Sequence, residues 1–149
     1  MKSNRKIIRF FIMVFLLAVG VFLSLHKHSS SPRELCYQSH CFTLEIVDTP
    51  ASMERWLMFR KSLPAHYGML FVFQDISVHD FWMKNTLIPL DMVWLDKNFT
   101  VVDIKHAIPC IQDPCSIYHP QGPSSYVVEF AWWTTKTIGL SEGAQMIYK

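Results

Sequence analysis

The sequence LIPLDMVWLDKNFTVVDIK, residues 87–105, decides the fold class of this chain. Its first half is an apolar run that ends at Leu95, and its second half alternates in polarity from Phe99 to Lys105. Between the two halves, Asp96-Lys97-Asn98 is rich in turn-forming residues. Two such runs joined by a short polar turn are typical of a β-hairpin. We therefore predict strands over residues 87–95 and 99–105, paired with each other.

Further strand and helix signals lie on both sides of this hairpin. Short apolar or alternating runs predict strands over residues 42–47, 69–73, 80–84, 126–130 and 144–148. A helix is expected over 51–59, begun by Asp48-Thr49-Pro50, and another over 131–138, ended by Gly139. Residues 108–125 contain four prolines and are expected to form an irregular loop. The pattern predicts a mainly β domain, a small sandwich or barrel-like fold with one or two short helices.

Several motifs in this part of the chain resemble one known family. The longest is FWMKNTLIPLDMVWLD, residues 81–96, and the others are RWLMFR (55–60), Leu63-Pro64, GMLFVF (68–73), Val101-Val102, Pro109-Cys110, Pro114-Cys115, Tyr118 and YVVE (126–129). On these motifs the chain is identified as a member of the domain of unknown function 192 family. The resemblance implies a compact, mostly β domain that is often exported. It implies no agreed activity, so it assigns no catalytic residue.

The chain departs from the family pattern in two places. Ala131-Trp132-Trp133 stands where the family often has a small, glycine-containing helix start. The pair Cys36 and Cys41 lies outside the family motif. These features are expected to be peculiar to this branch of the family.

The N-terminus predicts a membrane anchor. Residues 7–25 read IIRFFIMVFLLAVGVFLSL, with Arg9 as the only charge. As a helix this stretch would span roughly 28 Å, close to the hydrocarbon thickness of a bilayer. Basic residues precede it, which places the N-terminus in the cytoplasm. A cleaved signal peptide is the alternative, although no small-x-small cleavage site follows the run, and either segment would export the domain.

The resulting organisation has four parts. Residues 1–6 are expected in the cytoplasm, 7–25 in the inner membrane as a single-pass signal-anchor, 26–40 in a tether, and 41–149 in a periplasmic or extracellular β domain. From Arg33 onward, nine Lys and Arg residues stand against twelve Asp and Glu. A nucleic-acid-binding domain is usually basic, so nucleic acid is not expected as a partner.

The four cysteines fit an exported domain. They form two pairs with the same spacing, Cys36/Cys41 and Cys110/Cys115. An even number of cysteines in a small exported domain favours disulfides over metal binding or catalysis. Three pairings are possible, and the sequence favours two local bridges only because cross-pairing would need a further contact.

One acidic residue stands out as a candidate binding residue. Asp91 lies in the apolar strand LDMVWL, and a buried carboxylate must be paired or neutralised. Lys84 and Arg60 are candidate partners, and Asn85 could donate a further hydrogen bond. With Trp82, these residues would line a ligand pocket. The alternative is a structural ion pair that fixes a turn.

Two other groups of residues could serve a function. Trp132 and Trp133 are adjacent on an expected helix, so they cannot both face one core, and an exposed tryptophan would suit a ligand or a partner protein. His106, Cys110, Cys115 and His119 have side chains that can bind zinc or copper. Because an oxidising compartment favours disulfides, we predict no metal and no cofactor.

The common enzyme motifs do not occur in the sequence. It contains no G-x-S-x-G, no H-E-x-x-H and no phosphate-binding glycine loop. The leading hypothesis is therefore a non-enzymatic domain that binds a saccharide or peptide of the cell envelope near Trp82 and Asp91. The alternatives are an envelope hydrolase that uses Asp91 and an adaptor that docks a partner protein through Trp132 and Trp133.

Overall fold

The structure, a computed structural model, describes residues 33–53 and 57–149. The expected anchor over residues 7–25 lies outside these ranges. Among the described residues, no helix is both long enough and apolar enough to cross a membrane. The first strand begins at Glu34, so part of the range expected as a tether belongs to the folded unit.

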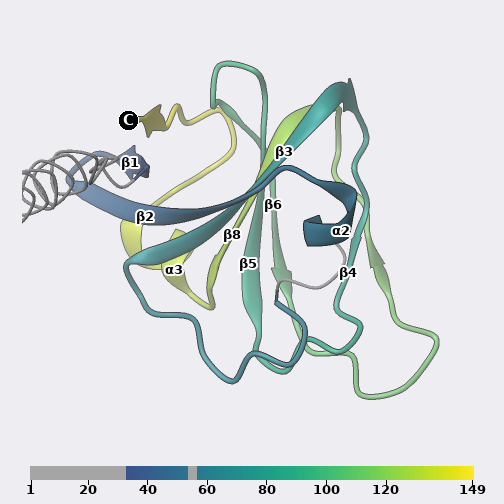
Figure 1. The fold of residues 1–149 in the computed structure, drawn as a ribbon. Coiled ribbons are helices and arrows are strands. Elements are labelled where there is room, and N and C mark those ends of the chain that lie inside the picture. Colours follow the sequence, from purple (N-terminus) through teal and green to yellow (C-terminus); the bar gives the residue numbers. More distant parts are fainter. Residues whose placement is uncertain (1–32, 54–56) are drawn as a thin grey trace, which may run out of the picture. The chain divides into compact units, whose positions relative to one another are not determined.

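Nine strands and two helical segments follow one another along the described chain (Figure 1). They are β1 (Glu34–Tyr37), β2 (His40–Val47), α2 (Pro50–Met53), β3 (Tyr67–Ser77), β4 (Phe81–Trp82), β5 (Leu90–Leu95), β6 (Val101–Ala107), β7 (Ile117–Tyr118), β8 (Ser124–Ala131), α3 (Thr134–Ile138) and β9 (Ile147–Tyr148).

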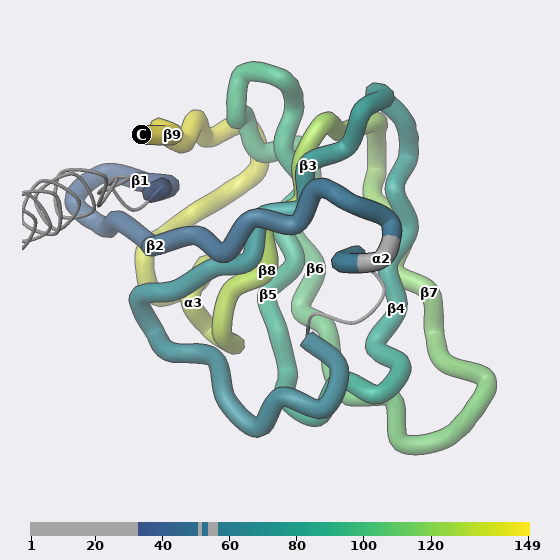
Figure 2. Tube along the Cα trace, viewed as in Figure 1, coloured from purple at the N-terminus to yellow at the C-terminus, as the bar shows by residue number. Residues whose placement is uncertain are grey.

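Seven of the strands form one sheet, in the order β6-β5-β8-β3-β2-β1-β9. Only β2 and β3 are parallel neighbours; the other pairs are antiparallel. Figure 1 shows that the sheet is strongly curled. Strands β4 and β7 pair separately and lie side by side in Figure 2. The mainly β prediction is confirmed, in the form of one curled sheet that resembles half a barrel.

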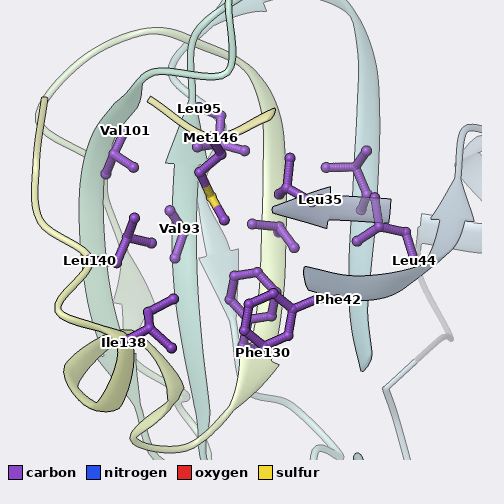
Figure 3. Packing of buried hydrophobic residues seen from close by; sticks show 12 residues of the cluster. Leu35, Phe42, Leu44, Val93, Leu95, Val101, Phe130, Ile138, Leu140 and Met146 are labelled. Carbon is purple, nitrogen blue, oxygen red and sulfur yellow. The ribbon is translucent and has the colours of Figure 1, made fainter. Parts of the chain in front are cut away.

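The curled sheet has a hydrophobic cluster on each face, because successive strand residues point to opposite sides. In β5, Val93 and Leu95 belong to the first cluster, whereas Met92 and Trp94 belong to the second. Figure 3 shows the first cluster, in which Phe42 and Phe130 pack together and Ile138 of α3 covers the sheet. All six residues of β5 are buried, which explains why five of them are apolar, with Asp91 as the exception.

The predicted hairpin is formed by β5 and β6, with Val93 opposite Ile104. The turn is held by Asp96, whose side chain accepts hydrogen bonds from the backbone N–H groups of Asn98 and Thr100, each at 2.8 Å. The N-terminal strand of the pair begins at Leu90 rather than at residue 87, directly after Pro89. A proline cannot donate to the ladder, which accounts for the later start.

The first predicted helix begins as expected but does not reach residue 59. Thr49 and Ser52 bond reciprocally at its start: each side-chain oxygen accepts from the other residue's backbone N–H, at 3.1 and 3.2 Å. At its other end, Met58 forms a β-bridge with Thr86, and Phe59 has a φ of 63°. Phe59 also donates its backbone N–H to the carbonyl of Asn85 at 2.8 Å. These tertiary bonds replace helical ones, so the prediction was wrong at this end.

The remaining predictions differ mainly in length. Strand β4 covers only two residues of the predicted 80–84, and β9 covers only two of 144–148. The expected irregular loop over 108–125 contains β7, which pairs with β4. The second helix begins at Thr134 rather than at residue 131, because Ala131 still belongs to β8. It ends at Ile138 as predicted, directly before Gly139, which has a φ of 70°.

Candidate functional site

Asp91 is a fully buried carboxylate with four donors around it. It lies on β5, opposite His106 of β6, and its exposure is 0%. The Nδ1 of His106 donates to Oδ1 at 2.7 Å, and the backbone N–H of Trp133 donates to the same oxygen at 3.3 Å. Thr135 donates its backbone N–H and its hydroxyl to Oδ2, both at 2.8 Å. The buried charge is therefore satisfied by hydrogen bonds.

This network joins helix α3 to the sheet. Trp133, the residue that precedes α3, makes no capping bond with its own side chain. Asp91 instead accepts from backbone N–H groups at the beginning of the helix, which would otherwise lack partners. A carboxylate at a helix N-terminus is also favoured by the helix dipole. Asp91 thus performs the capping role from a strand far away in the sequence.

His106 is oriented by the same carboxylate. Because Nδ1 donates to Asp91, the neutral ring has its acceptor at Nε2. The side chain of His106 is 45% exposed, so the ring can meet a ligand. Its centroid lies 5.7 Å from that of Trp132 and 6.1 Å from that of Trp133. An oriented imidazole therefore stands beside two indole rings.

Trp133 has an unusual backbone conformation for a large residue. Its φ is 68° and its ψ is 2°, in the left-handed region that glycine adopts without strain. Its side chain is 48% exposed, and the Lys136 ammonium lies 4.5 Å from the ring centroid. Trp132 is half-buried, so the two indoles do not face one core. A strained and exposed tryptophan is a marker of a functional position.

A hollow of about 540 Å³ opens next to these tryptophans. It is bounded by the β1–β2 turn, a loop before β3, the end of β8, and α3. Its lining residues are Ser39, His40, Cys41, Phe42, Ala65, His66, Ala131, Trp132, Trp133, Thr134, Thr137 and Ile138. Among the described residues that line it, none is a Lys, Arg, Asp or Glu.

A second hollow, of about 510 Å³, is lined by Ile104 and His106 of β6 together with residues of α3 and of the segment after it. Thr135 and Lys136 belong to this lining, whereas Thr134 and Thr137 line the first hollow. The same short helix therefore borders both hollows.

The cluster predicted around Asp91 is divided between different partners. Asp91 pairs with His106, whereas Lys84 forms an ion pair with Asp113 at 3.3 Å and Arg60 forms one with Glu45 at 2.8 Å. The sequence missed His106 as the partner of Asp91. The predicted turn over residues 96–98 would have paired Asp91 with Asp103, whereas the longer turn and a register shift between Trp94 and Leu95 bring His106 opposite Asp91.

The other members of that cluster lie near Lys84. The ammonium of Lys84 is 5.6 Å from the Trp82 ring centroid, and Trp82 is 53% exposed. Asn85 has a φ of 58°, and its side-chain amide points at the sulfur of Met58 at 3.8 Å. Trp82 and Lys84 thus lie close together as predicted, but the carboxyl group beside them is not that of Asp91.

That carboxyl belongs to Glu129, which sequence reasoning did not single out. Glu129 lies on β8 and is 4% exposed, and burial raises its pKa to about 8. It lines a cavity of about 60 Å³ together with Trp82 and Lys84. The available signal was the one that identified Asp91, namely an acidic residue within an apolar strand, here YVVEF over residues 126–130.

The cysteines form two local disulfides, Cys36–Cys41 and Cys110–Cys115. This confirms the favoured pairing. The two histidines among the four residues that could bind zinc or copper form hydrogen bonds with separate carboxylates. His106 bonds to Asp91, and His119 bonds to Asp80 at 2.8 Å. The two histidines and the two cysteines therefore do not form one site.

Comparisons with known proteins identify relatives of this chain. A model of the family DUF192, described as "Uncharacterized ACR", matches residues 34–148. No curated protein matches. A crystal structure of a proposed transcription regulator from Sinorhizobium meliloti 1021 is similar, with 32% identity and a TM-score of 0.70 over 78% of this chain and 91% of that one. A protein of unknown function from Novosphingobium aromaticivorans DSM 12444 has 28% identity and a TM-score of 0.69, over 82% and 89% of the two chains.

Proposed function

This chain belongs to the DUF192 family of uncharacterised proteins, and we propose that its β domain is a binding module for a neutral saccharide. The ligand would enter the hollow lined by Trp132 and Trp133. The single observation that carries this proposal is the strained, half-exposed Trp133 at the edge of a hollow large enough for a small molecule.

The chemistry of the lining favours a polyhydroxylated, uncharged ligand. Indole faces offer large flat apolar surfaces that suit the C–H faces of a sugar ring. Around them, Ser39, Thr137 and His66 supply hydroxyl and imidazole groups that can donate or accept hydrogen bonds. A ligand with a formal charge would find no Lys, Arg, Asp or Glu among the described residues of this lining.

A peptide or a protein partner is less favoured at this place. Extended peptides commonly bind by adding a strand to an open sheet edge. The edges of the seven-stranded sheet are β6 and β9, and neither strand lines the larger hollow. The hollow is also concave, whereas a docking surface for a folded partner is usually flatter and larger.

A hydrolase that uses Asp91 is the weaker alternative. Both oxygens of Asp91 accept hydrogen bonds within the protein, and the carboxylate is fully buried. A nucleophile or general base must reach the substrate directly or through one water molecule. The role that suits Asp91 is to orient His106 and α3.

We also propose that the domain is exported and held at the inner membrane by residues 7–25, with the N-terminus in the cytoplasm. The two disulfides support an oxidising compartment. Nucleic acid is not proposed as a partner, because the acidic residues outnumber the basic ones from Arg33 onward. Protease added to intact spheroplasts should digest the domain, and full protection would overturn this topology.

The saccharide proposal is tested by intrinsic tryptophan fluorescence on the full-length chain in a detergent without a sugar headgroup. The probes are soluble N-acetylglucosamine oligomers and cellotetraose, with a tetrapeptide for comparison. The expected result is saturable quenching by at least one oligosaccharide that the Trp133→Gly variant loses. Trp82→Ala removes an equally exposed tryptophan outside the hollow, so it is the matched control and should retain binding. Binding that Trp133→Gly leaves unchanged, or binding of the peptide alone, would overturn the proposal.

A further inference from the structure

Glu129 occupies a buried position whose neighbours on the sheet are apolar. It lies on β8, an interior strand of the sheet, with Met69 of β3 on one side and Met92 of β5 on the other. Both methionines are fully buried and belong to the second hydrophobic cluster. Strand alternation places Val127 in the same cluster, and Glu129 is the next residue on that face. A carboxyl group therefore stands inside the core.

The Glu129 carboxyl has no polar partner within residues 33–53 and 57–149. No described residue donates a hydrogen bond or forms an ion pair to it, in contrast to Asp91 with its four donors. Burial accordingly raises its pKa to about 8, so the group carries a proton at neutral pH. A buried polar group without partners is costly, and its presence calls for an explanation.

The carboxyl borders a small cavity whose walls combine apolar and aromatic side chains with Lys84 and Thr86. The volume is about 60 Å³, and a single water molecule needs only about 10–15 Å³ on this measure. The lining residues are Met53, Leu57, Met58, Phe71, Phe81, Trp82, Lys84, Thr86 and Glu129. A carboxyl group that shares a cavity with three aromatic rings, those of Phe71, Phe81 and Trp82, offers chemistry that can bind organic cations.

Few charged residues lie near the cavity within the described part of the chain. Lys84 is the only cationic residue in the described lining. Its ammonium forms an ion pair with Asp113 at 3.3 Å and lies 5.6 Å from the centroid of the Trp82 ring. The indole at the cavity mouth therefore already accepts an ammonium group on its face. Glu54 and Arg55 are the charged residues between Met53 and Leu57, and they lie outside the described residues.

We propose that the Glu129 cavity is a binding site for one small primary ammonium group, presented by an amine, a lysine side chain or an amino sugar. The protonated carboxyl releases its proton to the solvent as the ammonium enters, and the resulting carboxylate forms an ion pair with the ligand. The ammonium group of the ligand thus takes the place of the proton on the Glu129 carboxylate, and the net charge of the cavity does not change. The site is separate from the saccharide hollow, because Glu129 belongs to one face of the sheet and α3 packs on the other.

Proton release gives the proposal a distinctive signature. Below pH 8 the apparent affinity should rise about tenfold for each unit of pH, because the ammonium competes with one proton for the same carboxylate. Above the pKa the affinity should level off. A neutral ligand that bonded to the protonated acid would show the opposite trend, with binding lost as the pH rises.

The experiment is isothermal titration of the full-length chain with methylammonium at pH 6.0, 7.0 and 8.5, in buffers that differ in ionisation enthalpy. The expected result is one site, about one proton released at pH 6.0, about tenfold tighter binding at pH 7.0 than at pH 6.0, and loss of binding in Glu129→Gln. Trp133→Gly should bind as the wild type does, which separates this site from the saccharide hollow. A second readout needs no variant: the infrared carbonyl band of a protonated carboxyl should disappear when methylammonium saturates the protein.

Three results would overturn the proposal. The first is that methylammonium does not bind, or binds without dependence on pH or on Glu129. The second is that it binds only to Arg55→Gln, which would mean that the chain's own Arg55 fills the cavity. The third is that silver ion binds in its place and is lost in Met53→Leu, which would assign the cavity to a soft metal held by thioether sulfur.

Discussion

Replacement of Glu129 by glutamine should change how the stability of the domain depends on pH. The wild-type carboxyl is almost completely buried, and burial raises its pKa from 4.5 to about 8. Glutamine has nearly the same shape but does not titrate. The free energy of unfolding of the two proteins should therefore diverge as the pH rises.

The sign and size of the effect follow from linkage. Between pH 4.5 and pH 8 the folded protein holds a proton on Glu129 that the unfolded chain has already released. The contribution of Glu129 to the free energy of unfolding is therefore largest below pH 4.5 and falls as the pH rises through this window. For these two pKa values the loss between pH 5 and pH 7 is about 2–3 kcal/mol. Other titrating groups are common to both proteins and cancel in the comparison.

The assay is urea unfolding of wild type and Glu129→Gln at pH 5, 6, 7 and 8, followed by near-ultraviolet circular dichroism. We expect the wild type to lose about 2–3 kcal/mol relative to the variant between pH 5 and pH 7. Parallel stability curves for the two proteins would refute the reasoning, since they would mean that Glu129 titrates alike in the folded and unfolded states. A wild type that gains stability relative to the variant would show that an unseen cation pairs with the carboxylate.

Three further substitutions test the geometry around α3 and the sheet. Asp91→Asn puts an amide where both oxygens now accept, so it should destabilise the domain by about 2–4 kcal/mol in urea unfolding; a loss below about 1 kcal/mol would mean that the network contributes little. Trp133→Gly should be more stable than Trp133→Ala by about 1 kcal/mol, because both lack the indole and only glycine is unstrained at a φ of 68°; equal midpoints would contradict the left-handed backbone. Gly68→Ala would place a Cβ 2.8 Å from Cε1 of Phe130, so thermal unfolding should show a loss of about 1–3 kcal/mol; an unchanged melting temperature would show that the ring can move aside.

Much of the fold could be predicted because its signals are local. The turn at Asp96 and the runs on either side of it fixed the β5–β6 hairpin, and Gly139 marked the end of α3. The end of the first helix could not be found in this way. Met58 is drawn into a bridge with Thr86, a residue far along the chain, and no local propensity reports such a contact.

The candidate site was predicted less well for the same reason. Asp91 was recognised as anomalous, but its partner was sought among neighbouring cations such as Lys84. Its actual partners come from β6 and from the backbone at the start of α3. A backbone N–H leaves no mark in a sequence, so a carboxylate that caps a distant helix cannot be distinguished from one that binds a ligand.

The two buried carboxyls illustrate what a sequence pattern can and cannot decide. Asp91 in LDMVWL and Glu129 in YVVEF are the same anomaly, an acid within an apolar strand on neighbouring strands of one sheet. The structure gives Asp91 four donors and gives Glu129 none within the described residues. A buried carboxylate with hydrogen-bond partners is explained by the elements that it joins. A buried carboxyl without partners destabilises the fold, and an apolar residue would be more stable at its position. Of the two, Glu129 is therefore the carboxyl whose burial the surrounding residues do not explain, and the measurement of its proton is the more direct test of the proposed ammonium site.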